Sequence, residues 1–295
     1  MDDIVPSLLE AIQDDFKRQW KENKTIGRIW GKIKSKTVSY KDANQFAIEV
    51  GEMLARSYRK YITSGTLPEG KMWYNIATRI LEPTFHTNYS LITDVCDEVQ
   101  KIFNEENKVG LGTVAPEFNN DKMMGFINKL SNAENFEDVE WMLDEPVVNF
   151  SQSIVDDYIR TNADLHYKSG LTPKIRRSIG DSNPCPWCRN LAGTYDYPYV
   201  PRDVYRKHER CRCVVEYIRD GKYIQNVHTK TWVDGHEDPD ARQRRIEKEA
   251  IARANQRRRQ EEQIAVAELM RQHPDWSERG ATIYYRTQIL PKRNY

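Results

Sequence analysis

The chain has 295 residues, of which 39% are hydrophobic and 30% are charged, and its formal net charge is +1. The length allows one large domain or two smaller ones, and the composition is polar without being that of a disordered chain. The near-neutral total argues against a globally basic nucleic-acid-binding protein, so any such contact must come from a local excess of charge. No apolar run approaches the length of a bilayer span, so no membrane-spanning segment is expected.

The N-terminus and the cysteines indicate a reducing compartment. The chain begins Met1-Asp2-Asp3, with no basic stretch and no apolar stretch after it, so we expect no signal peptide. Four of the five cysteines lie within residues 185–213. Without a signal for secretion, bound metal accounts for that group better than disulfides do. The fifth, Cys96, stands alone and is interpreted as a small core residue.

Residues 1–168 are predicted to form a helical domain. Apolar residues there recur at intervals of three and four, the spacing that gives a helix one buried face. The pattern predicts helices at residues 7–22, 39–61, 73–80, 89–103, 123–130, 136–143 and 147–167. Ser39 is placed to cap the second of these helices, with Asp42 at the third position, where the helix dipole favours an acid.

Glycine, proline and asparagine residues indicate where the predicted helices are interrupted by connectors and loops. Glycines and lysines make residues 25–38 a predicted connector, and residues 109–120 are predicted to be a loop. Pro83 is predicted to end a short helix.

We find no catalytic motif in the first 165 residues. There is no phosphate-binding loop, no dinucleotide-binding glycine pattern and no HExxH sequence. Acid pairs such as Glu105-Glu106 and Asp156-Asp157 are interpreted as solvated, because adjacent residues on a helix do not face each other. The aromatic residues on the helix faces are interpreted as core.

Residues 169–237 are predicted to form a separate small α+β or β-hairpin module. Residues 174–179 and 214–218 are candidate strands. Asp220-Gly221 predicts a turn, after which residues 223–227 would return as the second strand of a hairpin. A module of this size buries little apolar surface, and a bound zinc ion would add on the order of 10 kcal/mol of folding free energy.

The module contains a sequence pattern typical of a zinc site. Cys185 and Cys188 form a CxxC, and His208, Cys211 and Cys213 form an HxxCxC after a loop. Thiolates and imidazoles are the ligands zinc prefers, and four of them close a tetrahedral structural site. Five candidates compete for four places, and either His208 or Cys213 lies outside the coordination shell. A redox CxxC would not need the second cluster.

The stretch resembles the phage head morphogenesis family, also described as Mu F-like minor capsid proteins. Members carry the CxxC, then a Leu-x-Gly turn, here Leu191-Ala192-Gly193, then the HxxCxC ending that runs into a strand. The sequences at 204–208 and 225–230 are similar to a subgroup found in prophages of Gram-positive bacteria. The resemblance is strong over about 165–235 and weak elsewhere.

This resemblance implies a structural protein without catalytic activity. It implies a minor head protein attached near the portal on the capsid interior, acting in head assembly or in DNA packaging or ejection. The implied partners are the portal protein and the major capsid or scaffold protein. The implied location is the virion, and the host cytoplasm during assembly.

Residues 238–295 are predicted to form a basic helical arm. A helix is predicted from about residue 240, after Asp238 and Pro239, to residue 272, before Pro274, and residues 281–286 are β-prone. Residues 241–295 hold 13 Lys and Arg against 7 Asp and Glu, a net charge of +6, which leaves −5 for the rest. The arm is interpreted first as a solvated or protein-binding helix, and second as a contact to DNA phosphates. The candidate contact residues are Arg244, Arg245, Arg257, Arg258 and Arg259.

Two other functions are weighed against the structural one. A zinc-module nuclease or toxin domain would use His228 beside Asn226, with His236 nearby, but nothing in the sequence fixes their geometry. A zinc-finger regulator would need a recognition helix between the two clusters, and Gly193, Pro198 and Pro201 interrupt that span. We therefore predict a mainly α protein that is not an enzyme.

Overall fold

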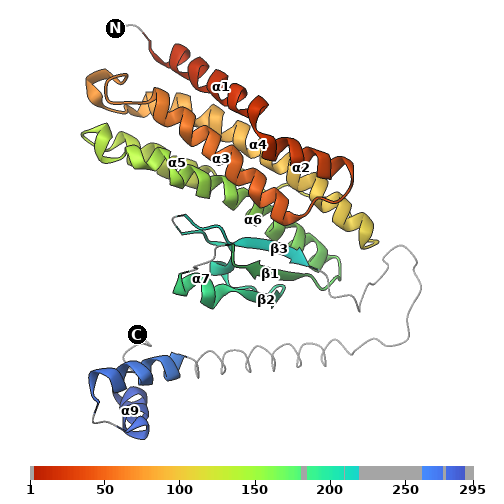
Figure 1. The fold of residues 1–295 in the computed structure, drawn as a ribbon, viewed down its shortest axis with the longest axis vertical. Helices are drawn as coiled ribbons and strands as arrows, with labels where there is room; N and C mark the ends of the chain where they lie inside the picture. Colours follow the sequence, from red (N-terminus) through yellow and green to blue (C-terminus); the bar gives the residue numbers. More distant parts are fainter. Residues whose placement is uncertain (1–2, 181–184, 209, 219–260, 275–276, 290–295) are drawn as a thin grey trace. The chain divides into compact units, whose positions relative to one another are not determined.

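The computed structural model describes residues 3–180, 185–208, 210–218, 261–274 and 277–289. The protein is mainly helical with a small three-stranded antiparallel sheet among these residues (Figure 1). The chain forms two compact units, Met1–Lys230 and Thr231–Tyr295, each described separately below. Within the described ranges, no helix combines the length and the apolar character needed to cross a bilayer.

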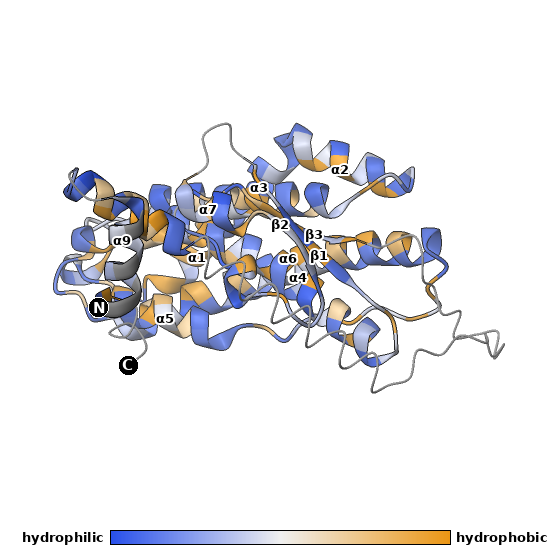
Figure 2. Ribbon diagram, turned by 90° about the horizontal axis from the view of Figure 1, so that it is seen from below, coloured by the Kyte–Doolittle hydropathy of each residue, from blue (hydrophilic) through white to orange (hydrophobic). Residues whose placement is uncertain are grey.

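The first unit begins with six helices, and short 3-10 turns lie in the connections after the third and the fifth of them. The turns are η1 (Pro68–Gly70), η2 (Phe136–Asp138) and η3 (Glu140–Leu143). The helices are α1 (Val5–Glu22), α2 (Lys24–Lys34), α3 (Tyr40–Tyr61), α4 (Tyr74–Glu106), α5 (Asn120–Ser131) and α6 (Glu145–Lys168). Helices α3, α4, α5 and α6 lie side by side (Figure 1). Figure 2 shows hydrophobic and hydrophilic residues alternating along the helices, as expected when one face is buried.

Local signals in the sequence set several of these boundaries correctly. The Ser39 side chain accepts a bond from the Asp42 amide, and the Asp42 carboxylate accepts one from the Ser39 amide, so the predicted cap is a reciprocal capping box. The predicted loop after α4 is confirmed up to Asn119, whose side chain caps α5.

The predicted connector at residues 25–38 is wrong, because residues 24–34 form helix α2. The Asn23 side chain caps this helix by accepting a 3.0 Å bond from the Ile26 amide. Ile26 and Ile29 are buried in the core, whereas Gly27 has open space around it. Burial of one apolar face therefore outweighs the weak helix propensity of glycine.

Pro83 does not end a helix, contrary to prediction, but lies inside the single helix α4. A proline in a helix removes one backbone hydrogen bond. Ile80, Leu81 and Phe85 around it are fully buried, and this packing keeps the chain helical through the proline. Residues 136–143, predicted as one helix, are instead the two 3-10 turns η2 and η3.

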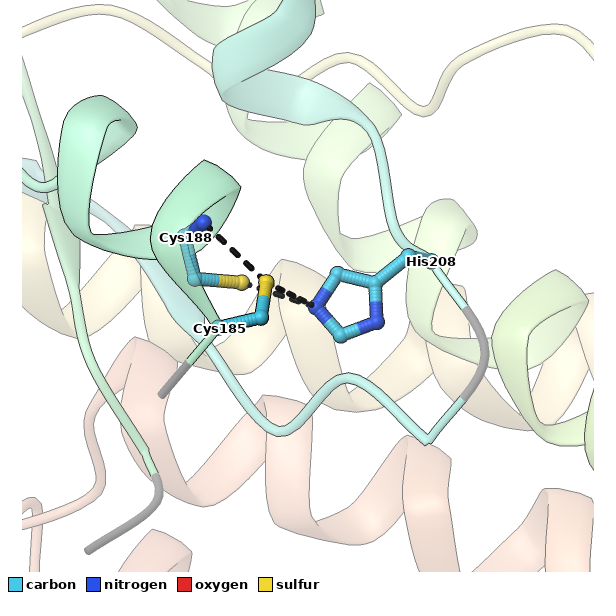
Figure 3. Close-up of side chains that lie close together, drawn as sticks. All are labelled: Cys185, Cys188 and His208. Carbon is cyan, nitrogen blue, oxygen red and sulfur yellow. Dashed lines mark hydrogen bonds between the residues drawn. The ribbon is translucent and has the colours of Figure 1, made fainter. Parts of the chain in front are cut away.

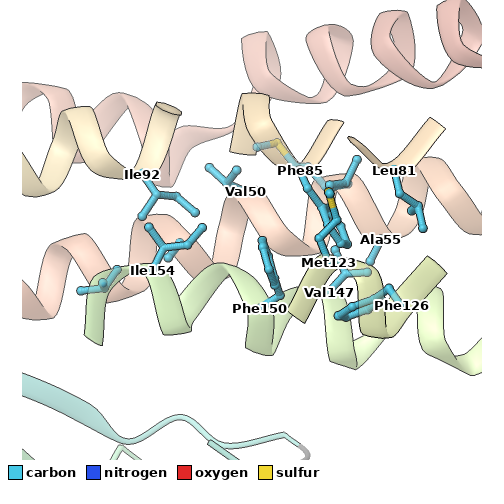
Figure 4. Close-up of a cluster of buried hydrophobic side chains, with 14 of the residues drawn as sticks. Val50, Ala55, Leu81, Phe85, Ile92, Met123, Phe126, Val147, Phe150 and Ile154 are labelled. Carbon is cyan, nitrogen blue, oxygen red and sulfur yellow. The ribbon is translucent and has the colours of Figure 1, made fainter. Parts of the chain in front are cut away.

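Phenylalanine rings from three helices lie among aliphatic side chains in the buried cluster of the helical layer (Figure 4). The rings of Phe85 from α4 and Phe150 from α6 stack with centroids 4.5 Å apart. Phe126 from α5 meets Phe85 edge-on at 5.1 Å. The interpretation of these aromatics as core is confirmed, since all three are buried.

Helices α3 and α6 approach each other closely at Gly51. A Cβ atom built on Gly51 would stand 2.8 Å from the Cα atom of Val148 and 2.9 Å from the Ser151 hydroxyl oxygen. Backbone atoms cannot move aside without shifting a helix. The contact therefore requires a residue without a side chain.

The sheet has the order β2-β1-β3, and both neighbours run antiparallel to β1. Its strands are β1 (Lys174–Ser178), β2 (Gly193–Asp196) and β3 (Val214–Ile218). The strands predicted at 174–179 and 214–218 are confirmed. The predicted return strand at 223–227 lies outside the described residues, and β2 was not predicted.

The sheet packs onto the helices through β3. Tyr217 lies edge-on to Phe103 of α4, with ring centroids 4.7 Å apart. Its hydroxyl lies 2.8 Å from Nδ1 of His166, which is fully buried near the end of α6. Burial lowers the pKa of His166 to about 4, so this imidazole is neutral at physiological pH. Sheet and helices thus share one core.

In the second unit, residues 261–272 are helical and α9 (Glu278–Tyr284) is followed by a π-helical turn, Tyr285–Ile289. The β-prone interpretation of residues 281–286 is therefore wrong. Ser277 caps α9, and Ala281 and Tyr285 pack against Val266 and Leu269, so packing overrides strand propensity. The predicted helix end before Pro274 is confirmed, and residues 240–260 lie outside the described residues.

Replacing Gly51 by alanine is expected to lower the free energy of unfolding by about 1–3 kcal/mol, the usual cost of overpacking a core. Urea unfolding followed by circular dichroism measures the change. The matched control is Gly125→Ala in α5, where an added methyl meets nothing within 4 Å. This control should be neutral or stabilising by up to about 1 kcal/mol. Equal stabilities for the two variants would contradict the close approach.

Candidate metal centre

Helix α7 (Pro186–Leu191) begins at the CxxC and points its sulfurs to one side. Cys185 is the N-cap, and its sulfur accepts a 3.3 Å bond from the Cys188 amide. Pro186 follows at the first helical position, where its missing N–H costs nothing. The two sulfurs therefore lie within one turn of each other, directed at His208 (Figure 3).

The second half of the cluster comes from the segment that enters β3. His208 follows the 3-10 turn η4 (Arg202–Tyr205), and Cys211 and Cys213 come just before the strand. Gly180, after β1, makes room for this segment, because a Cβ atom there would stand 1.7 Å from the Arg212 carbonyl oxygen. The sheet thus brings together residues more than twenty positions apart in the chain.

The structure brings together all five predicted ligands. One triad is Cys185, Cys188 and His208, and a second is Cys188, Cys211 and Cys213, each with its ligand atoms within 4.8 Å. Nε2 of His208 lies 3.4 Å from the Cys185 sulfur and 2.9 Å from the Cys188 sulfur. The Cys188 and Cys211 sulfurs are 3.9 Å apart. Across the described residues, no other group has this spacing.

Two of these three separations fit the edges of a zinc tetrahedron. Zn–S bonds of about 2.3 Å and Zn–N bonds of about 2.0–2.1 Å place two sulfurs about 3.8 Å apart, and a sulfur and a nitrogen about 3.6 Å apart. The Cys188–Cys211 and Cys185–His208 distances of 3.9 and 3.4 Å lie close to these values. The 2.9 Å between Cys188 and His208 would have to open by several tenths of an ångström.

The cluster is closed to solvent on its thiol side. Cys188, Cys211 and Cys213 are at most 3% exposed, and Cys185 and His208 are half-buried. A hydrogen bond with Cys211 lowers the pKa of Cys213 to about 7, and the same contact raises the pKa of Cys211 to about 12.

Arg177 of β1 is a buried neighbour of the cluster that sequence reasoning missed. Its Nη2 lies 3.6 Å from the Cys211 sulfur and 3.9 Å from the Cys188 sulfur. The signal was present in the alternation of the strand, since Arg177 is two residues from the fully buried Ile175 and faces the same side.

A second buried cation ties the metal segment to the helices. Nζ of Lys207 lies 3.1 Å from the Asp156 carboxylate of α6, in an ion pair without the alignment of a hydrogen bond. It also donates a 2.7 Å bond to the Cys213 carbonyl oxygen. Both charged side chains are 2% exposed, so the interpretation of Asp156 as a solvated residue is wrong. Burial raises the pKa of Asp156, and Lys207 opposes this shift.

A cavity of about 720 Å³ lies between the helices and the metal segment. Phe126, Trp141 and Asn149 line it from the helical side, and Tyr205 and Lys207 from the other. Its shape therefore depends on how residues 205–207 are held.

The other predicted functional residues lie outside the described residues. They are Asn226, His228 and His236 of the nuclease alternative, and Arg244, Arg245, Arg257, Arg258 and Arg259 of the basic arm.

Asp156→Asn should lower the free energy of unfolding by about 3–5 kcal/mol, because it leaves the Lys207 ammonium buried without a countercharge. Urea unfolding at neutral pH measures the loss. The neighbouring Asp157→Asn, at a partly exposed carboxylate, should change stability by less than about 0.5 kcal/mol. Replacing both partners, as Asp156→Leu with Lys207→Met, should recover part of the loss. A stable Asp156→Asn protein would show that the buried pair contributes little.

Comparisons with known proteins return no match for this chain, whether with protein-family models, curated proteins or solved structures.

Proposed function

We propose that the cluster binds one structural Zn²⁺ through Cys185, Cys188, His208 and Cys211. The observation that carries this proposal is a pair of overlapping triads that share Cys188, in which the Cys185–His208 and Cys188–Cys211 separations of 3.4 and 3.9 Å lie close to tetrahedral edges. Cys213 then lies outside the coordination shell, next to Cys211. Zinc would supply the folding free energy that a three-stranded sheet of this size cannot draw from its own apolar surface.

The surroundings of the cluster favour a structural ion over a catalytic one. A catalytic zinc site keeps one coordination position open for water or substrate. Here Cys188 and Cys211 are buried, Cys185 and His208 are half-buried, and the Trp187 ring lies edge-on to the His208 ring, with centroids 5.6 Å apart. This partial enclosure supports a site without catalytic activity.

We further propose that the protein is a minor capsid protein of a bacteriophage, acting in head assembly or in DNA packaging or ejection. The support is the resemblance of residues 185–213 to the head morphogenesis family, together with a cluster formed by the same residues. On this proposal the protein binds the portal and the major capsid or scaffold protein on the capsid interior. The basic residues 241–295 would contact packaged DNA through its phosphates.

Zinc content tests the metal proposal directly. Purified full-length protein should hold one zinc per chain, and a strong chelator should lower its thermal midpoint by removing the metal from the native state. Cys188→Ser and Cys211→Ser should lose the zinc, whereas Cys213→Ser should keep it. Cys96→Ala, at the buried cysteine that belongs to neither triad, is the matched control and should also keep it. Metal-free protein of unchanged stability would overturn the proposal.

The capsid proposal predicts that the protein is found in heads. An epitope-tagged chain, produced from its own phage or prophage, should co-purify with DNA-filled particles and with the portal protein. Cys188→Ser should be absent from those particles, and Cys96→Ala should be present.

The competing enzyme function predicts instead that the protein nicks plasmid DNA with Mg²⁺ or Mn²⁺, and that His228→Ala abolishes the nicking. Nicking together with absence from particles would replace the capsid proposal.

A further inference from the structure

Arg177 is among the largest fully buried side chains of the described protein, with 1% of its surface exposed. It lies in the central strand β1, next to Arg176, which is exposed and pairs with Glu216 at 3.2 Å. Arginine is almost never fully buried unless it is paired. The location of its partner therefore decides what the residue does.

One part of the guanidinium group holds the backbone that leads to His208. Nη1 donates bonds of 2.5 Å to the Val204 carbonyl oxygen and 2.9 Å to the Arg206 carbonyl oxygen. These carbonyls orient the guanidinium without neutralising it, because they carry no net charge. The guanidinium carbon also lies 5.1 Å from the centre of the Trp187 ring.

The remaining neighbours with anionic character are the thiols. Among the described residues, Arg177 forms no ion pair with a carboxylate within 4.0 Å. Asp156, an acid that acts on it electrostatically, is already paired with Lys207. The Cys211 and Cys188 sulfurs lie 3.6 and 3.9 Å from Nη2. Burying a cation without an anion nearby is costly, so this arrangement favours thiolates beside it.

We infer that Arg177 is the countercharge of the metal centre, with its guanidinium donating N–H bonds to the thiolates of Cys188 and Cys211. This inference rests on the proposed zinc site. Three thiolates and one Zn²⁺ carry a net charge of −1, and Arg177 brings the buried group to zero. The same side chain holds the segment that presents His208, so it both neutralises and positions the ligands. Partners of this kind commonly change metal affinity by about 10–100-fold.

Arginine suits this position better than lysine does. Its planar guanidinium group donates N–H bonds to sulfurs from one nitrogen and to carbonyl oxygens from another at the same time. A lysine ammonium would keep the charge and lose the bridge between the thiolates and residues 204–206.

Metal affinity and the cobalt spectrum of the full chain test the inference. Zinc affinity is measured by competition with a chromophoric chelator, and Co²⁺ replaces zinc for absorption spectroscopy. Arg177→Met should bind zinc about 10–100-fold more weakly. Its thiolate-to-cobalt charge-transfer band should shift to longer wavelength, because thiolates without N–H donors are richer in electrons. A merely structural role would not move that band. Arg176→Met, the adjacent control, should stay within about threefold of the parent protein and keep its spectrum.

The outcomes separate this inference from the proposed function. If the parent protein binds no metal, the proposed zinc site is wrong. If the parent protein binds zinc, and Arg177→Met has the same zinc affinity and cobalt spectrum, only the inferred role of Arg177 is wrong. Should Arg177→Met fail to fold, Arg177→Lys and Arg177→Gln are compared instead. If Arg177 is a countercharge, Arg177→Lys should bind zinc more tightly than Arg177→Gln. Equal or reversed affinities would overturn the inference.

Discussion

The buried charge around the thiol cluster is the constraint on which the rest of the small sheet depends. The Arg177 guanidinium and the Lys207 ammonium lie out of water beside the thiol cluster and the segment that carries His208 and Cys211. Each needs an anion nearby, because burying an isolated charge is costly. Lys207 forms an ion pair with Asp156, and Arg177 lies within hydrogen-bond distance of the Cys188 and Cys211 sulfurs. The segment is therefore fixed by charge pairing and hydrogen bonds as much as by apolar contact.

The helical layer supplies the rigid support for this arrangement. Asp156 belongs to α6, which packs tightly on α3 at Gly51, so the carboxylate that meets Lys207 is fixed in place. The sheet is attached on the same side, through Tyr217 and its contacts with Phe103 and His166. A structural metal here would join the α7 segment to the segment before β3, both within the small sheet unit.

Errors in the prediction share one cause, which is packing that the sequence pattern does not reveal. Glycines at 27 and 31 suggested a connector, but both have open space around them while Ile26 and Ile29 are buried. Pro83 suggested a helix end, but the residues around it are anchored in the core of α4. Asp156 and Asp157 looked alike, although one is buried against Lys207 and the other is partly exposed.

By itself the sequence determined the helical character of the first 168 residues, the two longer strands and the group of five candidate ligands. These follow from short-range patterns: apolar spacing, the Ser39 cap, and thiols placed two or three residues apart. Tertiary structure alone decided that Cys188 belongs to both triads, that β2 pairs with β1, and that Arg177 and Lys207 are buried beside the cluster. The reason is physical: burial and pairing of a charge depend on which distant segment packs against it, and no local spacing encodes that partner.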